Sequence, residues 1–193
     1  LTVFEGRPGA AITDDAMNVI RVKQVTGSNV CAGKFFRDTV TAMTAEAIPT
    51  VLNNVAPEHT AVVTILRAAL PMAVAYHQAD VRTFGVVAAS RGHASLRPTI
   101  AYTRLPPEIA QSLRVGVVDP AFATAGSGMT TVELLIIMGV PADRIVLHTV
   151  DVAPEGVLIF RRKFPQIRIV THSRSNQLNE MGYLIDVGVN DAG

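Results

Sequence analysis

The sequence has one cysteine, almost no excess of charge of either sign, and no long hydrophobic run. With Cys31 as the single cysteine in 193 residues, neither an internal disulfide framework nor a cysteine-based zinc site can form. The 17 basic and 16 acidic residues leave a net charge of +1, so no broad field attracts nucleic acid. Apolar runs such as Leu134–Val140 are far shorter than the roughly 20 residues of a membrane span. We therefore expect no nucleic-acid partner and no membrane partner, and any anion site must be local.

Apolar residues are abundant in this chain. They make up 49% of the sequence and charged residues 17%, a composition typical of buried strands and not of a disordered chain. A chain of 193 residues fits one domain and can bury about 70% of its unfolded surface. We expect one domain over residues 1–193, with an N-terminal arm at 1–24, irregular over Leu1–Asp15, and a flexible loop at 90–107. Nothing marks secretion, so the expected location is cytoplasmic.

Short β-branched segments alternate along the chain with segments of helical spacing. The expected strands are Ala61–Leu66, Phe84–Val87, Leu113–Val118, Ile145–Val150 and Ile167–Thr171. The expected helices are Arg37–Leu52, Ala68–His77, Gly128–Met138 and Pro154–Lys163. This alternation predicts an α/β fold, a central mostly parallel sheet with helices on both faces, which binds ligands beyond the carboxyl ends of its strands. The polar, proline-punctuated segment Ser90–Pro107 fits either a long flexible loop or a hairpin.

The third expected strand runs directly into a loop of small and hydroxyl-bearing residues, Asp119–Ser127. Small side chains let backbone N–H groups approach an anion, and the dipole of a following helix favours negative charge. Thr124 and Ser127 can add hydroxyl donors, and the Asp119 carboxylate can accept from sugar hydroxyls. The alternative is a helix capped by Ser127, with small residues for tight packing. The loop has neither the Gly-Lys-Ser/Thr of a Walker loop nor a Gly-x-Gly-x-x-Gly fingerprint.

Three segments in order carry a family resemblance. Val118–Ser127 (VDPAFATAGS) resembles the phosphoribosyl-pyrophosphate (PRPP) loop of uracil phosphoribosyltransferases. Ile65–Met72 (ILRAALPM) resembles that family's pyrophosphate loop, and Gln177–Tyr183 (QLNEMGY) with Gly188–Gly193 (GVNDAG) resembles its base-recognition segment. Weaker matches are Ala153–Gly156 (APEG) and Lys34–Arg37 (KFFR). The resemblance covers most of the chain and implies a type I phosphoribosyltransferase fold with a flexible arm.

The resemblance implies a PRPP site. Its residues would be Arg67, Arg91, Arg104, Asp119, Ala123, Thr124, Ala125, Gly126 and Ser127. Of these, Asp119, Arg67 and Arg104 would be catalytic, since a guanidinium can stabilise the charge of the leaving pyrophosphate. Arg91 and Arg104 would close over the pyrophosphate and exclude water. The alternatives from the residues alone are a surface salt bridge for Arg67 and solvated positions on a loop for the other two arginines.

The resemblance also implies a base site, read mainly by the backbone near the end of the chain. Its residues would be Tyr183, Leu184, Asn190, Asp191 and Ala192. Taken alone, Gly188–Gly193 also fits a polar turn or a frayed terminus. The histidines show no metal-ligand spacing, and His148 and His172 fit satisfied residues at the edge of the core. The chain is thus expected to supply no metal ligands, and the implied cofactor is Mg²⁺ carried in by PRPP.

The sequence departs from the family pattern at several places. Ala125 replaces a loop glycine, which is harmless only if its φ is negative. Residues without carboxylates stand where the flexible arm has an acidic run, namely Gly92, His93, Ala94 and Arg97. The base loop reads Asp186–Asn190 without the family's proline. The phosphate sites therefore match better than the base site, and a different amide-containing heterocycle fits the same residues as uracil.

These residues leave three hypotheses for function. The first is a transferase of pyrimidine salvage that converts uracil and PRPP to UMP and pyrophosphate, as a homodimer like the family. The second is a PRPP- or nucleotide-binding regulator that kept the phosphate cradle and lost catalysis. The third, an RNA-binding regulator, would need a basic face, which a net charge of +1 does not favour.

Overall fold

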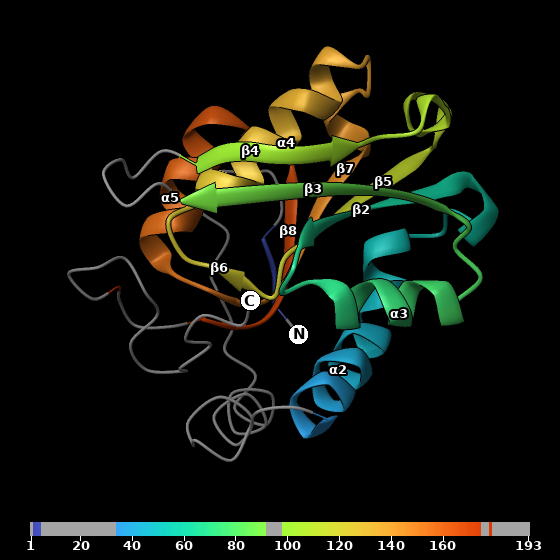
Figure 1. The fold of residues 1–193 in the computed structure, drawn as a ribbon, viewed down its shortest axis with the longest axis horizontal. Coiled ribbons are helices and arrows are strands. Elements are labelled where there is room, and N and C mark those ends of the chain that lie inside the picture. The colour runs from blue at the N-terminus through green and yellow to red at the C-terminus, as the bar shows by residue number, and fades with distance from the viewer. Residues whose placement is uncertain (1, 5–33, 92–97, 175–177, 179–193) are drawn as a thin grey trace.

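An eight-stranded sheet forms the centre of the computed structural model, which describes residues 2–4, 34–91, 98–174 and 178 (Figure 1). Its strands are β1 (Thr2–Phe4), β2 (Thr60–Leu66), β3 (Thr83–Arg91), β4 (Pro98–Arg104), β5 (Arg114–Val118), β6 (Ala121–Phe122), β7 (Ile145–Val152) and β8 (Arg168–Arg174). Their order is β1-β8-β7-β5-β2-β3-β4, and β6 pairs with β7. The strands from β8 to β3 are parallel, while β1 and β4 run antiparallel at the two edges.

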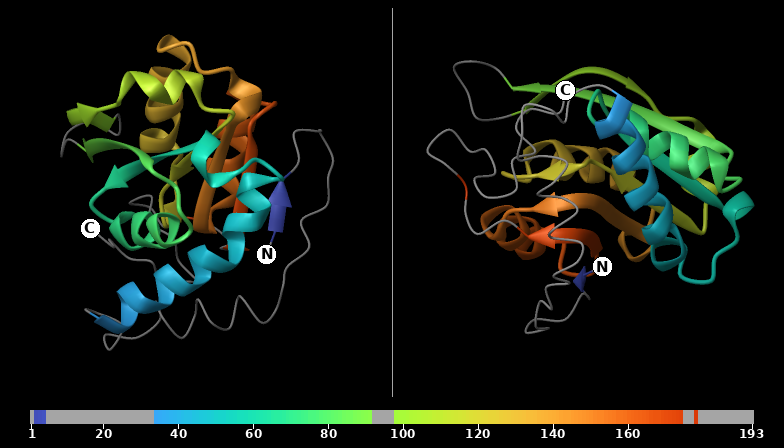
Figure 2. Two further views of the ribbon diagram at one scale, coloured as in Figure 1. Left: turned by 90° about the vertical axis from the view of Figure 1, so that its right-hand side faces the viewer. Right: turned by 90° about the horizontal axis from the view of Figure 1, so that it is seen from below.

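Helices cover both faces of this sheet (Figures 1 and 2). They are α2 (Lys34–Leu52), α3 (Leu70–Gln78), α4 (Gly126–Ile137) and α5 (Pro154–Lys163), with short 3₁₀ turns η1 (Pro57–His59), η2 (Pro107–Gln111) and η3 (Ala142–Arg144). Pro71 and Pro154 lie in the first turns of α3 and α5, where a missing N–H breaks no helical hydrogen bond. Within the described residues, none of the helices has the length and apolar character needed to span a bilayer.

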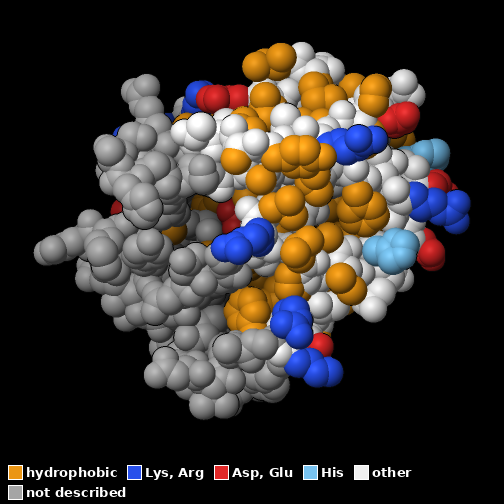
Figure 3. Space-filling model, in the orientation of Figure 1, with side chains coloured by type: hydrophobic (Ala, Val, Ile, Leu, Met, Phe, Trp, Pro, Cys, Tyr) orange, Lys and Arg blue, Asp and Glu red, His pale blue; other side chains and the backbone are white. Residues whose placement is uncertain are grey.

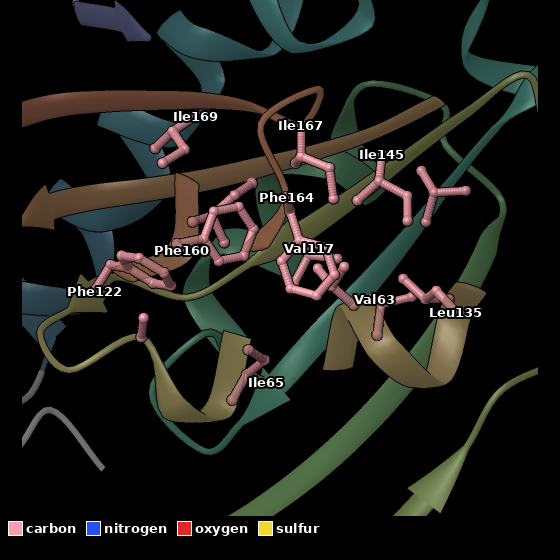
Figure 4. Close-up of a cluster of buried hydrophobic side chains, with 14 of the residues drawn as sticks. Val63, Ile65, Val117, Phe122, Leu135, Ile145, Phe160, Phe164, Ile167 and Ile169 are labelled. Atoms are coloured by element: carbon pink, nitrogen blue, oxygen red, sulfur yellow. The ribbon is translucent and has the colours of Figure 1, made fainter. Parts of the chain in front are cut away.

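Alternate residues of the central strands build two separate cores. Val63 and Val117 belong to the core under α4 and α5, whereas Val62 and Val118 belong to the core under α2 and α3. Figure 4 shows the first core, in which Phe160 of α5 meets Phe122 of β6 edge to face at a centroid distance of 5.4 Å. Burying each such side chain stabilises the fold by about 1.5–3 kcal/mol. The contact also fixes the loop that carries Phe122 against the sheet.

The structure confirms the expected α/β architecture and each expected element. The helix Pro154–Lys163 has the bounds that the spacing predicts, and α2 begins three residues before the expected Arg37. Of the two interpretations of Ser90–Pro107, the hairpin holds, because Pro98–Arg104 forms β4 and pairs with β3. Regular structure at residues 98–104 corrects the expectation of a flexible loop over that stretch.

Two short strands correct the sequence-based expectations. Thr2–Phe4, expected as irregular, pairs with β8 in the register Thr2 to Thr171. Ala121–Phe122, expected as loop, pairs with Asp151–Val152 of β7. Pairing of this kind joins residues far apart in the chain, so no local sequence pattern predicts it. The other residues of the expected arm at 1–24 lie outside the described residues.

Candidate active site

The carboxyl ends of the five parallel strands, β3, β2, β5, β7 and β8, lie at one edge of the sheet. Thr64 of β2 pairs with Val118 of β5, and Val118 pairs with His148 of β7. Arg67 follows the end of β2 and Asp119 follows the end of β5. Because β2 and β5 pair directly, at the usual strand spacing of about 4.8 Å, these two residues follow the ends of adjacent strands. The sequence predicts site residues after the strands, but not which strands are neighbours. The arrangement gathers a cation and a carboxylate at the edge where such sheets bind ligands.

Asp119–Ser127, which we call the cradle loop, is held to β7 by backbone hydrogen bonds. The Asp119 N–H donates to the His148 carbonyl at 3.1 Å. The Pro120 carbonyl accepts from the N–H groups of Val150 at 3.2 Å and Asp151 at 3.0 Å. The half-buried Asp119 carboxylate accepts the Ala121 N–H through Oδ1 at 3.3 Å. These bonds give Asp119 a defined position at the start of the loop.

The cradle loop turns into α4 through Ala125, whose φ is +67°. The first helical bond joins the Met129 N–H to the Ala125 carbonyl at 2.8 Å, so the N–H groups at positions 126–128 precede it and can face an anion. The N-cap is Ala125, which has no side-chain cap hydrogen bond, and this rules out Ser127 as the cap. The replacement of a loop glycine by Ala125 would be harmless only with a negative φ, and the φ is positive. Alanine therefore has a steric cost at this position that glycine would not have.

Two glycines let neighbouring elements pack tightly around the cradle loop. A Cβ on Gly128 would lie 2.6 Å from the Phe122 ring. A Cβ on Gly156, in the first turn of α5, would lie 2.2 Å from the Ala123 carbonyl oxygen. Real side-chain carbons do not approach that closely, so both positions require glycine. The start of α5 is therefore pressed against the backbone of the loop.

The segment after β2 forms the second part of the candidate site. The Leu66–Arg67 peptide bond is cis, and the Arg67 side chain is exposed. The Arg67 carbonyl accepts the Leu70 N–H at 3.2 Å, and buried Ala69 is the N-cap of α3. Arg67 therefore stands between the end of β2 and the start of α3, and β2 is the neighbour of β5, which Asp119 follows.

Arg104 lies farther across the sheet from β5 than Arg67 does. It ends β4 and pairs with Val86 of β3, so two strand spacings, about 10 Å, separate it from β2. Its side chain is exposed. Arg91 is the last residue of β3, and its side chain and residues 92–97 lie outside what the structure describes. The expected base residues Tyr183, Leu184, Asn190, Asp191 and Ala192 also lie outside the described residues.

A buried histidine below the site differs from expectation. His148 lies inside β7 and not at the edge of the core, and its Nδ1 is hydrogen-bonded to the Tyr76 hydroxyl at 2.8 Å. Its Nε2 is buried, and no described residue is a hydrogen-bond partner for it. Burial, with a smaller contribution from His172 nearby, lowers the pKa of His148 to about 3, and burial raises the pKa of Tyr76. His148 is thus a neutral imidazole within the core and not a satisfied residue at its edge.

Two hydrogen bonds beside the cradle loop are not predicted by the sequence. The buried Asp151 carboxylate accepts a hydrogen bond from the Ser173 hydroxyl at 2.6 Å. The Glu155 carboxylate accepts one from the Leu178 N–H at 3.3 Å. Glu155 belongs to the APEG segment, the one local signal available, but its partner is 23 residues away. Among the described residues, no three His, Cys, Asp or Glu side chains gather as metal ligands.

Sequences similar to this chain come from one protein family. The family model described as uracil phosphoribosyltransferase matches residues 19–193. A uracil phosphoribosyltransferase from Deinococcus radiodurans is 38% identical over 140 residues, which are 69% of this chain and 62% of that protein. The chain spans about half to two thirds of the length of the curated relatives it matches.

Solved structures share the fold at low identity. The AQ2163 protein from Aquifex aeolicus matches with a TM-score of 0.82 and 20% identity, over 94% of each chain. An adenine phosphoribosyl transferase from Trypanosoma brucei matches with a TM-score of 0.65 and 13% identity, over 95% of this chain and 91% of its own. That structure is a complex with AMP, pyrophosphate and ribose-5-phosphate.

Proposed function

This chain belongs to the uracil phosphoribosyltransferase family, and we propose that it transfers the phosphoribosyl group of PRPP to N1 of uracil. In this reaction the bond from C1 of the sugar to the pyrophosphate oxygen breaks, a bond from C1 to N1 forms, and the N1 proton passes to solvent. The products are UMP and pyrophosphate. The cradle loop is the observation that carries the proposal, because it joins a parallel strand end to a helix start with small residues and a carboxylate.

The cradle loop would bind the 5′-phosphate. The backbone N–H groups at 126–128 and the hydroxyls of Thr124 and Ser127 supply donors, and small Ala123 and Ala125 leave the backbone accessible. Asp119 would accept from the ribose hydroxyls and favour the cation-like sugar of the transition state, since a fixed carboxylate stabilises developing positive charge.

Arg67 would bind the pyrophosphate from the adjacent strand end. Its guanidinium can donate two parallel hydrogen bonds to phosphate oxygens and stabilise the charge that grows on the leaving group. Arg91 and Arg104, from the β3–β4 hairpin, would close over the pyrophosphate and exclude water from it. Because Arg104 lies at the base of this hairpin, its role requires the hairpin to move or the substrate to reach it. Mg²⁺ would enter as part of the substrate, bound to the pyrophosphate.

The acceptor site would lie in the segment after Leu178. Tyr183 would shape the pocket, and the backbone of Leu184, Asn190 and Ala192 would pair with the pyrimidine edge, with Asp191 orienting the ribose or a water. A base with a different pattern of hydrogen-bond donors and acceptors would leave groups of the pocket unpaired. The loss of binding free energy is large enough to select uracil over such a base. The family match runs through residue 193, which supports placing this segment in the site. We place the reaction in pyrimidine salvage in the cytoplasm.

We further propose that the protein works as a homodimer joined through α2 and α3. A groove of about 570 Å³ between these helices is lined by Leu70, Pro71, Val74 and Phe84, with Arg37 and Asp38 among its other lining residues. Hydrophobic side chains with basic ones beside them are exposed over this region (Figure 3). Opposite charges next to an apolar groove are self-complementary across a two-fold axis. Val74→Glu is expected to give monomers by sedimentation, and Ile137→Glu, on the opposite face, is not; a dimer in both variants would refute this interface.

An assay with PRPP, Mg²⁺ and uracil tests the proposed reaction. UMP and pyrophosphate are expected in equal amounts, and calorimetry is expected to show PRPP binding without uracil. PRPP binding without any product from uracil or a related heterocycle would favour the regulatory protein over the enzyme. No binding of PRPP or of ribose 5-phosphate would refute both, because the cradle loop would then hold no phosphate.

A further inference from the structure

Leu178 lies against the cradle loop although it is four residues past the end of β8. Its side chain is half-buried and packs against a small cluster of alanines from the loop and from the start of α5, namely Ala121, Ala123 and Ala153. Its N–H donates to Oε1 of Glu155 at 3.3 Å. Among the described residues, an apolar contact joins Leu178 to the loop, and a hydrogen bond joins its N–H to a carboxylate of α5.

Glu155 has a defined position relative to the cradle loop. Ala153, the N-cap of α5, donates its N–H to the Phe122 carbonyl at 2.9 Å. One residue after Glu155, the Cα of Gly156 is pressed against the Ala123 carbonyl. The carboxylate lies in the first turn of α5, where the helix dipole favours a negative charge. The hydrogen-bond acceptor for Leu178 therefore moves with the loop that would bind phosphate.

We propose that Glu155 and Leu178 are positioning residues: they hold the chain at Leu178 against the cradle loop and so set where the acceptor base lies relative to the phosphate. The inference rests on the proposed function, because the expected base residues begin at Tyr183, five residues after Leu178. Attack on C1 needs the base nitrogen in line with the leaving group, and small misplacements of a reacting group cost large factors in rate. The attachment of Leu178 to Glu155 and the cradle loop, which we call the tie, supplies that alignment, although neither residue contacts a substrate.

Substitutions of Glu155 distinguish a positioning role from a role that only stabilises α5. If the carboxylate only stabilised the start of α5 through the dipole, its neutralisation to glutamine would matter as much as its removal. If the carboxylate acts as the acceptor for the Leu178 N–H, glutamine keeps an oxygen there and alanine does not. Glu155→Gln and Glu155→Ala therefore separate the two roles, and Glu58→Ala, an exposed acid in η1 near the opposite ends of the strands, is the matched control.

Steady-state kinetics give the first test. Glu155→Ala is expected to raise KM for uracil about 3- to 10-fold, which corresponds to the loss of one such hydrogen bond, with KM for PRPP changed less than about twofold. Leu178→Ala is expected to act in the same direction, while Glu155→Gln and Glu58→Ala stay near the parent value. Equal rises in both KM values, or a glutamine variant as impaired as the alanine variant, would overturn the proposal.

Hydrogen exchange gives a test that does not depend on the reaction. The Leu178 amide of the full chain without ligands is expected to exchange faster in Glu155→Ala than in Glu155→Gln, with amides of β2 unchanged in both. An unchanged rate at Leu178 in Glu155→Ala would refute the tie itself. A faster rate together with no turnover of uracil by the parent protein would refute the proposed function and leave the tie standing, so the two failures are distinguishable.

Discussion

Protonation of His148 should make the protein sensitive to mild acid. The imidazole is completely buried between β7 and α3, where Tyr76 donates to or accepts from its Nδ1, and the His172 ring lies 6.3 Å away. Burial lowers its pKa in the folded protein from 6.5 to about 3. The unfolded chain therefore takes up a proton at pH values where the folded protein does not, and the unfolding free energy falls as the pH drops below 6.5.

The size of the effect follows from the two pKa values. Between these two pKa values, each unit by which the pH falls lowers the unfolding free energy by about 1.4 kcal/mol. The loss begins only as the falling pH approaches 6.5. Between pH 7 and pH 5 the His148 contribution is about 2 kcal/mol, and between pH 7 and pH 4 it is about 3 kcal/mol. A loss of 2 kcal/mol is a large part of the 5–15 kcal/mol that is typical of a domain, so it is measurable by urea unfolding.

A His148→Asn variant isolates this contribution. Its Oδ1 lies near the place of Nδ1 and can accept from the Tyr76 hydroxyl, but the side chain does not titrate. The variant is expected to be less stable than the parent at pH 7 and to lose about 2 kcal/mol less on going to pH 5. His172 and the surface groups are common to both proteins, so the comparison removes them. Equal losses in the two proteins between pH 7 and pH 5 would refute the assignment of a neutral, buried His148.

Three further changes test the cradle loop. Ala125→Gly should raise the unfolding free energy by about 0.5–1 kcal/mol, because glycine relieves the positive φ and its greater freedom in the unfolded chain offsets part of the gain; a loss of stability in urea would contradict this. Gly156→Ala should cost more than about 2 kcal/mol and weaken PRPP binding in calorimetry, while Gly116→Ala, whose Cβ would meet its nearest atoms at 3.7 Å, should cost less; the reverse order would be the contrary result. Asp119→Asn should lower kcat at least about 100-fold with little change in the melting temperature, and undiminished turnover would remove Asp119 from the site.

The local parts of the site were predictable because each depends on neighbours in the chain. The run from Val115 to Val118 followed by small residues and hydroxyls predicts a strand, a loop and a helix start, and the structure has all three. The alternation of strands and helices likewise places Arg67 and Asp119 at one edge, because parallel strands align their carboxyl ends. Spacing alone misplaced His148, since a strand end and a strand interior look alike when the length of the strand is unknown.

The amino-acid sequence by itself determined the order of the elements, the small and hydroxyl-bearing residues of the loop near position 120 and the family resemblance, because side-chain periodicity and turn chemistry are local. Tertiary structure alone decided the sign of φ at Ala125, which depends on how the loop packs between α5 and β7. It also decided that Tyr76 meets His148 across 72 residues and that Glu155 meets Leu178 across 23. Such pairs form only when the sheet brings distant strands and helices together, and no single stretch of the chain encodes that proximity.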